Sequence, residues 1–316
     1  ITGNNASCIN DTIPFNVINT GGSTYNWTIT GGSVLSGNTT NAITAIWSTA
    51  GTAVVSVTET NSFGCTGDPV TYSVTVNPLP IVSAGVNDTI CTGDTTSLNA
   101  SGGIQYNWTP SAGLDNPTIA NPSAFPTSTT TYTVYVTDGN GCENNASVTI
   151  AVNALPIVSA GTNTAICIGT PTTLNATGAT TYVWSPSSGL SDPLIASPQA
   201  NPTSTTTYTV TGTDQNGCSN SAQIMVTVNL LPLAIAIDDT ILCNGSSITL
   251  TASGGVQYQW SPTTGLNNPN IQNPVAGPND PTTYTVVVTD VNGCTDDEEV
   301  FVDINPQPVA GFEVDT

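Results

Sequence analysis

Eight cysteines are the residues of this chain that are best suited to covalent chemistry, and they recur at a fixed interval. Three copies of one unit are offset by 76 residues, with the two cysteines of each copy 51 residues apart, and a looser first copy has a spacing of 57. The absence of histidine and of any close Cys-x-x-Cys pair disfavours zinc binding. An even number of regularly spaced cysteines therefore predicts disulfides and an oxidising, extracellular location.

Two pairing schemes are compatible with this spacing. We expect each repeat to close its own bond, which gives the pairs Cys8–Cys65, Cys91–Cys142, Cys167–Cys218 and Cys243–Cys294. The alternative joins neighbouring repeats, for example Cys142 to Cys167, and leaves Cys8 and Cys294 single. Pairing within the repeat is preferred because it leaves no cysteine of the chain unpaired.

Polar turns just before the second cysteine of each later repeat form a second candidate site. Calcium prefers the oxygens that Asp, Asn and backbone carbonyls supply, but no glutamate closes the loop and Asn-Gly is also a strong hairpin signal. Both interpretations stay open, and calcium is the only cofactor considered. The fourth repeat is the best candidate, because an acidic run (296–299) follows its turn. The candidate ligands are Asp138, Asp214, Asp290 and Asn292.

A tryptophan recurs in each repeat as part of a Tyr-x-Trp triplet. Such a pair could stack on a sugar, but one tryptophan per β-sandwich usually anchors the hydrophobic core, and we prefer that interpretation. The expected core anchors are Trp27, Trp108, Trp184 and Trp260.

The charge of the chain excludes several classes of function. Its 316 residues include no Lys, Arg or His and 21 Asp+Glu, for a formal net charge of -21. Nucleic-acid binding needs cations that displace counterions, and binding to an anionic membrane is disfavoured for the same reason. No apolar run reaches the roughly 18 residues of a membrane-spanning helix. Catalysis lacks a basic group, and the carboxylates lie mostly in turns without a visible pair, so we expect no enzyme.

The apolar pattern predicts an all-β chain. Runs such as 131–136 alternate apolar and polar residues, and clusters of Gly, Pro, Asn and Asp separate them. We expect tandem β-sandwich domains: repeat 1 (1–77, incomplete at its N-terminus), repeat 2 (78–153), repeat 3 (154–229), repeat 4 (230–305) and the start of a further repeat (306–316). Short Pro-bearing linkers predict an extended rod, with about 35–40 Å for each repeat.

Repeats 2–4 share the phrases Ile-Cys or Leu-Cys, Tyr-x-Trp followed by Pro, Gly-Leu, Thr-Tyr-Thr-Val and Asp-x-Asn-Gly-Cys. These phrases resemble the immunoglobulin-like and PKD-like repeats of large secreted surface proteins in Bacteroidota, among them the SprB-like gliding-motility adhesins exported by the type IX secretion system. Repeat 1, which has a second tryptophan at Trp47, is similar to the PKD-like subtype. The resemblance covers essentially the whole chain, and it implies an extracellular filament at the cell surface.

The repeats also depart from a true immunoglobulin domain. The usual tyrosine two residues before the second cysteine is missing. The first cysteine precedes the second strand and the second cysteine follows the sixth, and standard order places these points at opposite ends of the sandwich. Pairing within a repeat therefore requires a bent first strand or a different topology.

Four short triplets resemble the O-glycosylation signal of Bacteroidota, in which Asp precedes the acceptor threonine. All four lie close to the first cysteine of their repeat. This resemblance implies a glycoprotein. The candidate acceptors are Thr12, Thr89, Thr95 and Thr240.

Two functions remain. The first is the shaft of a secreted bacterial cell-surface adhesin or filament, in which the repeats set the reach and the disulfides and missing basic residues resist unfolding and proteolysis. The alternative is a glycan- or protein-binding adhesive module, stabilised by calcium. The expected partners are other repeats of the same chain, surface glycans or proteins, and a second chain through lateral or filament self-association of strand edges that no lysine guards.

Overall fold

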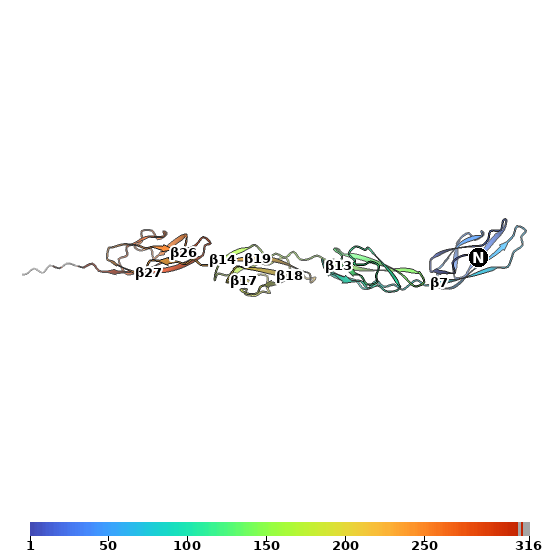
Figure 1. Ribbon diagram of the computed structural model, residues 1–316, viewed down its shortest axis with the longest axis horizontal. Helices are drawn as coiled ribbons and strands as arrows, with labels where there is room; N and C mark the ends of the chain where they lie inside the picture. Colours follow the sequence, from blue (N-terminus) through green and yellow to red (C-terminus); the bar gives the residue numbers. More distant parts are fainter. Residues whose placement is uncertain (309–310, 312–316) are drawn as a thin grey trace, which may run out of the picture. The chain divides into compact units, whose positions relative to one another are not determined.

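The computed structural model describes residues 1–308 and 311, which form β-strands joined by turns and loops (Figure 1). The all-β prediction is confirmed. The described residues contain no helix that could span a membrane. The chain divides into two compact units, Ile1–Ala154 and Leu155–Thr316. Of the residues predicted to start a further repeat (306–316), 309–310 and 312–316 lie outside the described part.

Repeat 1 is a sandwich of a four-stranded sheet, in the order β1-β7-β6-β3, and a three-stranded sheet, in the order β2-β5-β4. Its aromatic side chains fill the space between the sheets. Phe15, Trp27 and Trp47 are at most 2% exposed, and the ring of Phe15 meets that of Trp47 edge to face, with centroids 5.8 Å apart. The strands are β1 (Ala6–Cys8), β2 (Thr12–Asn16), β3 (Thr24–Ile29), β4 (Gly32–Ser36), β5 (Ala42–Trp47), β6 (Gly51–Thr60) and β7 (Val70–Asn77).

Repeat 2 keeps the four-stranded sheet, in the order β10-β12-β13-β8, but its second layer has only the short ladder β11-β9. Pro and Gly interrupt the segment between residues 110 and 126, so no long strand forms there. The strands are β8 (Asp88–Cys91), β9 (Thr96–Ser97), β10 (Gln105–Thr109), β11 (Ser123–Ala124), β12 (Thr130–Thr137) and β13 (Glu143–Asn153).

Repeats 3 and 4, in the second unit, have the same strand order as repeat 2. The strands of repeat 3 are β14 (Thr164–Cys167), β15 (Thr172–Thr173), β16 (Thr181–Ser185), β17 (Gln199–Ala200), β18 (Thr206–Thr213) and β19 (Ser219–Asn229). Repeat 4 adds a ladder of β20 with β23. Its strands are β20 (Ile235–Ala236), β21 (Thr240–Cys243), β22 (Ile248–Thr249), β23 (Ala252–Ser253), β24 (Gln257–Ser261), β25 (Val275–Ala276), β26 (Thr282–Thr289) and β27 (Thr295–Asn305).

Each repeat has its own core, because strand alternation sends every second side chain inward. In repeats 2–4 this core combines one tryptophan with the Tyr-x-Val run of the long central strand. The tryptophan at these positions is at most 2% exposed in all four repeats: Trp27, Trp108, Trp184 and Trp260. In the first three of them the indole N–H donates to a backbone carbonyl, of Thr40, Ile119 and Ile195 respectively.

In the four-stranded sheet of each repeat, the strand that comes first in the sequence and the strand that comes last lie side by side and run parallel. In repeat 2, β8 pairs with the end of β13, with Cys91 opposite Asn153. The same register recurs in the other three repeats. The first cysteine of every repeat is therefore placed at the end of the sandwich where the chain leaves it.

Candidate functional site

The cysteines occupy two kinds of backbone site, and each kind is built in the same way in all four repeats. We call the first kind the strand-end cysteines, which are Cys8, Cys91, Cys167 and Cys243. Each is the last residue of the first long-sheet strand and lies opposite the last asparagine of its repeat. The next residue donates its N–H to the carbonyl of that asparagine, over 2.8–3.0 Å. A turn three residues long then returns an N–H to the cysteine carbonyl.

We call the second kind the turn cysteines, which are Cys65, Cys142, Cys218 and Cys294. Each closes a tight turn that is capped by the side chain four residues earlier. In repeat 2 the Oδ1 of Asp138 accepts the N–H groups of Asn140 and Cys142, over 2.8 and 2.9 Å. Asp214 and Asp290 do the same, and in repeat 1 the amide oxygen of Asn61 replaces the carboxylate. The glycine before the cysteine has a φ of 81–83° in all four turns.

The two kinds of cysteine lie at opposite ends of a repeat. In repeat 2, Cys142 immediately precedes β13, whereas Cys91 lies opposite Asn153, the last residue of that strand. Eleven residues of strand separate the two positions, which is about 35 Å. A disulfide needs Cα atoms less than about 7 Å apart. The prediction that each repeat closes its own disulfide is therefore wrong.

The disulfides instead join consecutive repeats. Cys8 of repeat 1 bonds to Cys142 of repeat 2, with Cα atoms 5.5 Å apart. Cys167 of repeat 3 bonds to Cys294 of repeat 4, with Cα atoms 5.6 Å apart. Both bonds connect a strand-end cysteine to the turn cysteine of the following repeat. The alternative pairing of Cys142 with Cys167 is wrong as well, since both residues have other partners.

The remaining four cysteines differ in state. Cys91 and Cys218 are disulfide-bonded, whereas Cys65 and Cys243 are free and exposed. The prediction of a disulfide at Cys65 and Cys243 is thus contradicted for this chain. The predicted bond within the repeat cannot form because the two cysteines of each repeat lie at its opposite ends.

The bonded turn cysteines are buried, whereas the bonded strand-end cysteines Cys91 and Cys167 are half-buried. Cys142 and Cys294 are 0% exposed, and Cys8 is 7% exposed. The linker packs against the same place: the side-chain amide of Asn144 donates to the carbonyl of Pro80 over 2.9 Å, and Asn220 does the same to Pro156 over 3.1 Å. In repeat 4, Asp296 stands at the equivalent position and contacts the linker by accepting a hydrogen bond from the N–H of Ala234. Turn, linker and disulfide together hold the entrance of the repeat.

The side chains predicted to bind calcium instead form hydrogen bonds within the turns. Desolvation opposes ionisation of Asp290, but hydrogen bonds from the Cys294 N–H, the Asn292 side chain and the Asn292 and Gly293 N–H groups hold its pKa below the usual value. The Oδ1 atoms of Asp138 and Asp214 accept two amides each. Within the described residues, no group of three or more His, Cys, Asp or Glu side chains is placed to hold a metal ion. Calcium binding stays a prediction.

The predicted glycosylation acceptors lie on or beside the strand-end segments. Thr12, Thr89 and Thr95 are exposed, and Thr240 is half-buried. Asp88, which precedes Thr89, accepts hydrogen bonds from the hydroxyl of Thr96 and from the N–H of Thr89, and these lower its pKa. Nothing in the structure tests the modification itself.

Sequence reasoning missed the role of one tyrosine in each later repeat. Tyr132 is 0% exposed, and its hydroxyl donates to the carbonyl of Ala112 over 2.9 Å, which ties the central strand to the Gly-Leu loop. Tyr208 and Tyr284 make the same bond to Ser188 and Thr264. Burial raises the pKa of all three hydroxyls. The signal was present, because the tyrosines recur at the 76-residue period.

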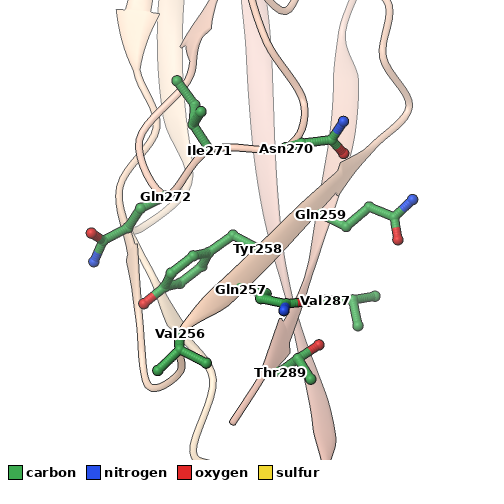
Figure 2. Close-up of a pocket in the computed structure, with 9 residues that line it drawn as sticks. All are labelled: Val256, Gln257, Tyr258, Gln259, Asn270, Ile271, Gln272, Val287 and Thr289. Carbon is green, nitrogen blue, oxygen red and sulfur yellow. The ribbon is translucent and has the colours of Figure 1, made fainter. Parts of the chain in front are cut away.

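Repeat 4 also carries an open recess of about 650 Å³ at the edge strand β24 (Figure 2). The phenol of Tyr258 and the amide of Gln272 extend to one side of it, whereas Gln259 and Asn270 extend to the other. Both side chains of the first pair are already engaged, since Tyr258 donates to the Gly255 carbonyl and Gln272 to that of Ala252. Gln259 and Asn270 remain available to a ligand without breaking these bonds.

Comparisons with known proteins find similar solved structures but no matching family. No protein-family model matches the chain, and no curated protein matches it in sequence. Among solved structures, it is similar to immunoglobulin domains 1–4 of Sidekick-1, at 13% identity over 95% of this chain and 96% of that chain, with a TM-score of 0.28. It is also similar to the insect immune protein hemolin (11% identity, 96% and 98% covered, TM-score 0.27) and to Drosophila N-cadherin EC1-4 (12%, 92% and 94%, TM-score 0.25).

TM-scores this low carry no argument about function. The assignment of tandem immunoglobulin-like β-sandwich repeats rests on the strand order and register described above.

Proposed function

We propose that this chain is a segment of a tension-resistant extracellular shaft, in which disulfides between repeats carry the load that would otherwise unfold the repeats. The observation that carries this proposal is the Cys8–Cys142 bond together with its counterpart Cys167–Cys294. Neither bond staples a repeat internally. Each creates a covalent shortcut from one repeat to the next.

The shortcut changes the path of a pulling force. Tension that enters unit 1 from the N-terminus passes from residue 8 through the disulfide to residue 142, and then along β13. Residues 9–141, which include nearly all of repeat 1 and most of repeat 2, lie inside the covalent loop. They cannot be extended by force until the bond is reduced, even if hydrogen bonds in the loop break.

Each disulfide prevents a long segment of the chain from being extended by force. The first loop spans a sequence separation of 134 and the second one of 127. At about 3.4 Å per extended residue these loops correspond to about 450 Å and about 430 Å of chain. A shaft built in this way keeps its reach under load, which a string of independently unfolding domains does not.

Single-molecule pulling on the 316-residue chain, held at its two ends, tests the proposal. We expect the oxidised chain to show little extension from unfolding, and the chain in reductant to extend by several hundred ångström more. The double variant Cys8→Ser with Cys142→Ser should regain a large part of the first loop without reductant. The matched control, Cys65→Ser with Cys243→Ser, should behave like the oxidised wild type. Equal extension with and without reductant would contradict the proposal that the disulfides carry the load.

The finer identity of the shaft is also a proposal. Disulfides of this kind persist in oxidising surroundings, so we place the chain outside the cell, at the cell surface. The resemblance of its repeats supports a secreted filament or adhesin of Bacteroidota, of the gliding-motility type, exported by the type IX system and carrying O-glycans. We propose a structural role and no enzymatic activity.

The recess of repeat 4 favours a second candidate function, the binding of a surface glycan. Amide side chains are suited to sugar hydroxyls, and Gln259 has Asn107 and Val183 at the equivalent positions of repeats 2 and 3. Titration of the chain with surface polysaccharide, with Gln259→Val as the variant and Val183→Gln as the control, tests this. Binding that Gln259→Val abolishes would support an adhesive module.

A further inference from the structure

We propose that Gln272 opens the recess of repeat 4, and that the indole N–H of Trp260 is the buried donor that selects a neutral saccharide there. The inference rests on the second candidate function, glycan binding by repeat 4, and names the residues that create the site and give it specificity. Its starting point is an unpaired polar group. Trp260 is 1% exposed, and none of the described residues accepts a hydrogen bond from its indole N–H.

The same indole nitrogen is paired in repeats 2 and 3. Trp108 and Trp184 each donate to the backbone carbonyl of the residue 11 positions later, over 3.0 and 3.1 Å. In repeat 4 the residue at that position is Ile271, which lines the recess. The indole N–H of Trp260 therefore faces the loop that forms one wall of the recess, but the carbonyl of Ile271 does not accept it.

A single difference in sequence accounts for this change. The residue after the isoleucine is Ala120 in repeat 2 and Ala196 in repeat 3, and its carbonyl accepts a backbone N–H over 2.9 and 2.8 Å. In repeat 4 the residue is Gln272, whose side-chain amide donates to the carbonyl of Ala252 over 2.8 Å. The N–H of Ala252 bonds to the side chain of Asn273 instead of to a backbone carbonyl. Because a glutamine side chain now stands where two backbones met directly, it holds the loop farther from its neighbour.

The change is confined to four residues of the loop. On one side, the backbone N–H of Trp260 donates to the carbonyl of Pro269 over 2.8 Å, and on the other the N–H of Leu250 donates to Pro274 over 2.9 Å. Both bonds have counterparts of the same length in repeat 2. Only the segment 270–273 follows a different path, and the recess of about 650 Å³ lies between it and β24 (Figure 2).

The lining of the recess indicates which ligand it takes. All 9 lining residues belong to repeat 4, and none of them is charged. The chain has no Lys or Arg to hold an anion, and its net charge of -21 repels anionic polymers. The side-chain amides of Gln259 and Asn270 can both donate to and accept from hydroxyls, whereas an indole N–H can only donate. A neutral saccharide meets both needs, since its oxygens accept the hydrogen bond of Trp260 when the segment 270–273 gives way.

Hydrogen exchange of the indole N–H groups, followed by NMR on the whole chain without ligand, tests the role of Gln272. We expect Trp260 to exchange about tenfold faster than Trp184, because its N–H lacks a partner. Gln272→Ala restores the residue of repeats 2 and 3 and should slow Trp260 to the rate of Trp184. The matched variant Ala196→Gln should make Trp184 exchange as fast as Trp260. Unchanged exchange in both variants would overturn the role of Gln272.

The same resonances test the role of Trp260 in binding. Three neutral polysaccharides (dextran, mannan and galactan) are compared with the anionic polysaccharide alginate. At least one neutral polysaccharide should slow the exchange of the Trp260 indole and leave those of Trp108 and Trp184 unchanged, whereas alginate should have no effect. Gln272→Ala should weaken this binding by about tenfold, because the loop carbonyl then occupies the donor.

The outcomes separate this inference from the function on which it rests. Binding that leaves the Trp260 indole unchanged would overturn its role as donor, and equal binding of alginate would overturn the selection of neutral ligands. If no polysaccharide binds but Gln272→Ala slows the exchange of Trp260, glycan binding by repeat 4 is rejected and the opening of the recess by Gln272 stands.

Discussion

The turn at Cys142, which we call closed because its cysteine is bonded to Cys8, and the turn at Cys65, which we call open because its cysteine is free, have nearly the same local backbone. The turn before Cys142 and the turn before Cys65 share their hydrogen bonds and their glycine conformation. The difference lies in what stands opposite: Cys142 meets the strand-end cysteine of the preceding repeat. The comparison teaches that the residues of the turn set its backbone conformation, whereas a disulfide also requires a second cysteine within reach.

Removing the closed bond should have the largest effect. For Cys8→Ser with Cys142→Ser we expect the free energy of unfolding to fall by about 2–5 kcal/mol, because the unfolded chain loses a long covalent loop. Denaturant titration of the whole chain measures this free energy of unfolding. Cys65→Ser with Cys243→Ser is the control and should change the free energy by less than about 0.5 kcal/mol, as expected for exposed positions. A similar loss in both variants would end the distinction between closed and open sites.

The cap of the turn should come next. Asp138→Ala leaves the N–H groups of Asn140 and Cys142 without their acceptor, so we expect a loss of about 2 kcal/mol in the stability of repeat 2. Asp138→Asn should cost much less, because Asn61 builds the same turn in repeat 1. Thermal melts of the two variants, with and without chelator, separate a capping role from a calcium site. Strong destabilisation of the wild-type chain by chelator, absent in both variants, would favour calcium.

The turn glycine should have a smaller and equal effect in both settings. Gly141 and Gly64 have φ values of 82° and 81°, and no atom lies within 4 Å of an added Cβ at either position. Gly141→Ala and Gly64→Ala should therefore each cost about 1 kcal/mol from conformation alone. Hydrogen exchange of the turn amides provides the measurement. A much larger cost at Gly141 would mean that the bonded turn is strained in a way that the open turn is not.

Acid should affect the turn at Cys294, and this effect should be the smallest. The folded-state pKa of Asp290 is lowered, so its contribution to stability is present above the pKa of the unfolded chain and is lost as the pH falls through the lowered value. Asn61 does not titrate, so the open turn of repeat 1 should be unaffected. The chemical shifts of the Cys294 and Cys65 backbone amides, measured by NMR between neutral pH and about pH 2, would report on the two turns. Asp290→Asn should remove the acid response at Cys294.

The strand pattern and the turns could be predicted because they depend on neighbouring residues. The alternation of residues 131–136 requires a strand with one buried face, and β12 covers that run. The Asn-Gly pairs predict tight turns, which lie at 138–142 and its counterparts. The role of Tyr132 could not be found in this way, because its partner Ala112 is 20 residues away in a loop whose path depends on packing.

What the sequence by itself determined is therefore local: an all-β chain, the period of 76 residues, and the tight turn before the second cysteine of each later repeat. Only the tertiary structure decided which cysteines meet. A spacing of 51 residues suggests a bond within the repeat, but β13 carries the chain from one end of the sandwich to the other and separates Cys91 from Cys142. The end of repeat 1 brings Cys8 to Cys142 instead, because a disulfide depends on distance in space and not along the chain.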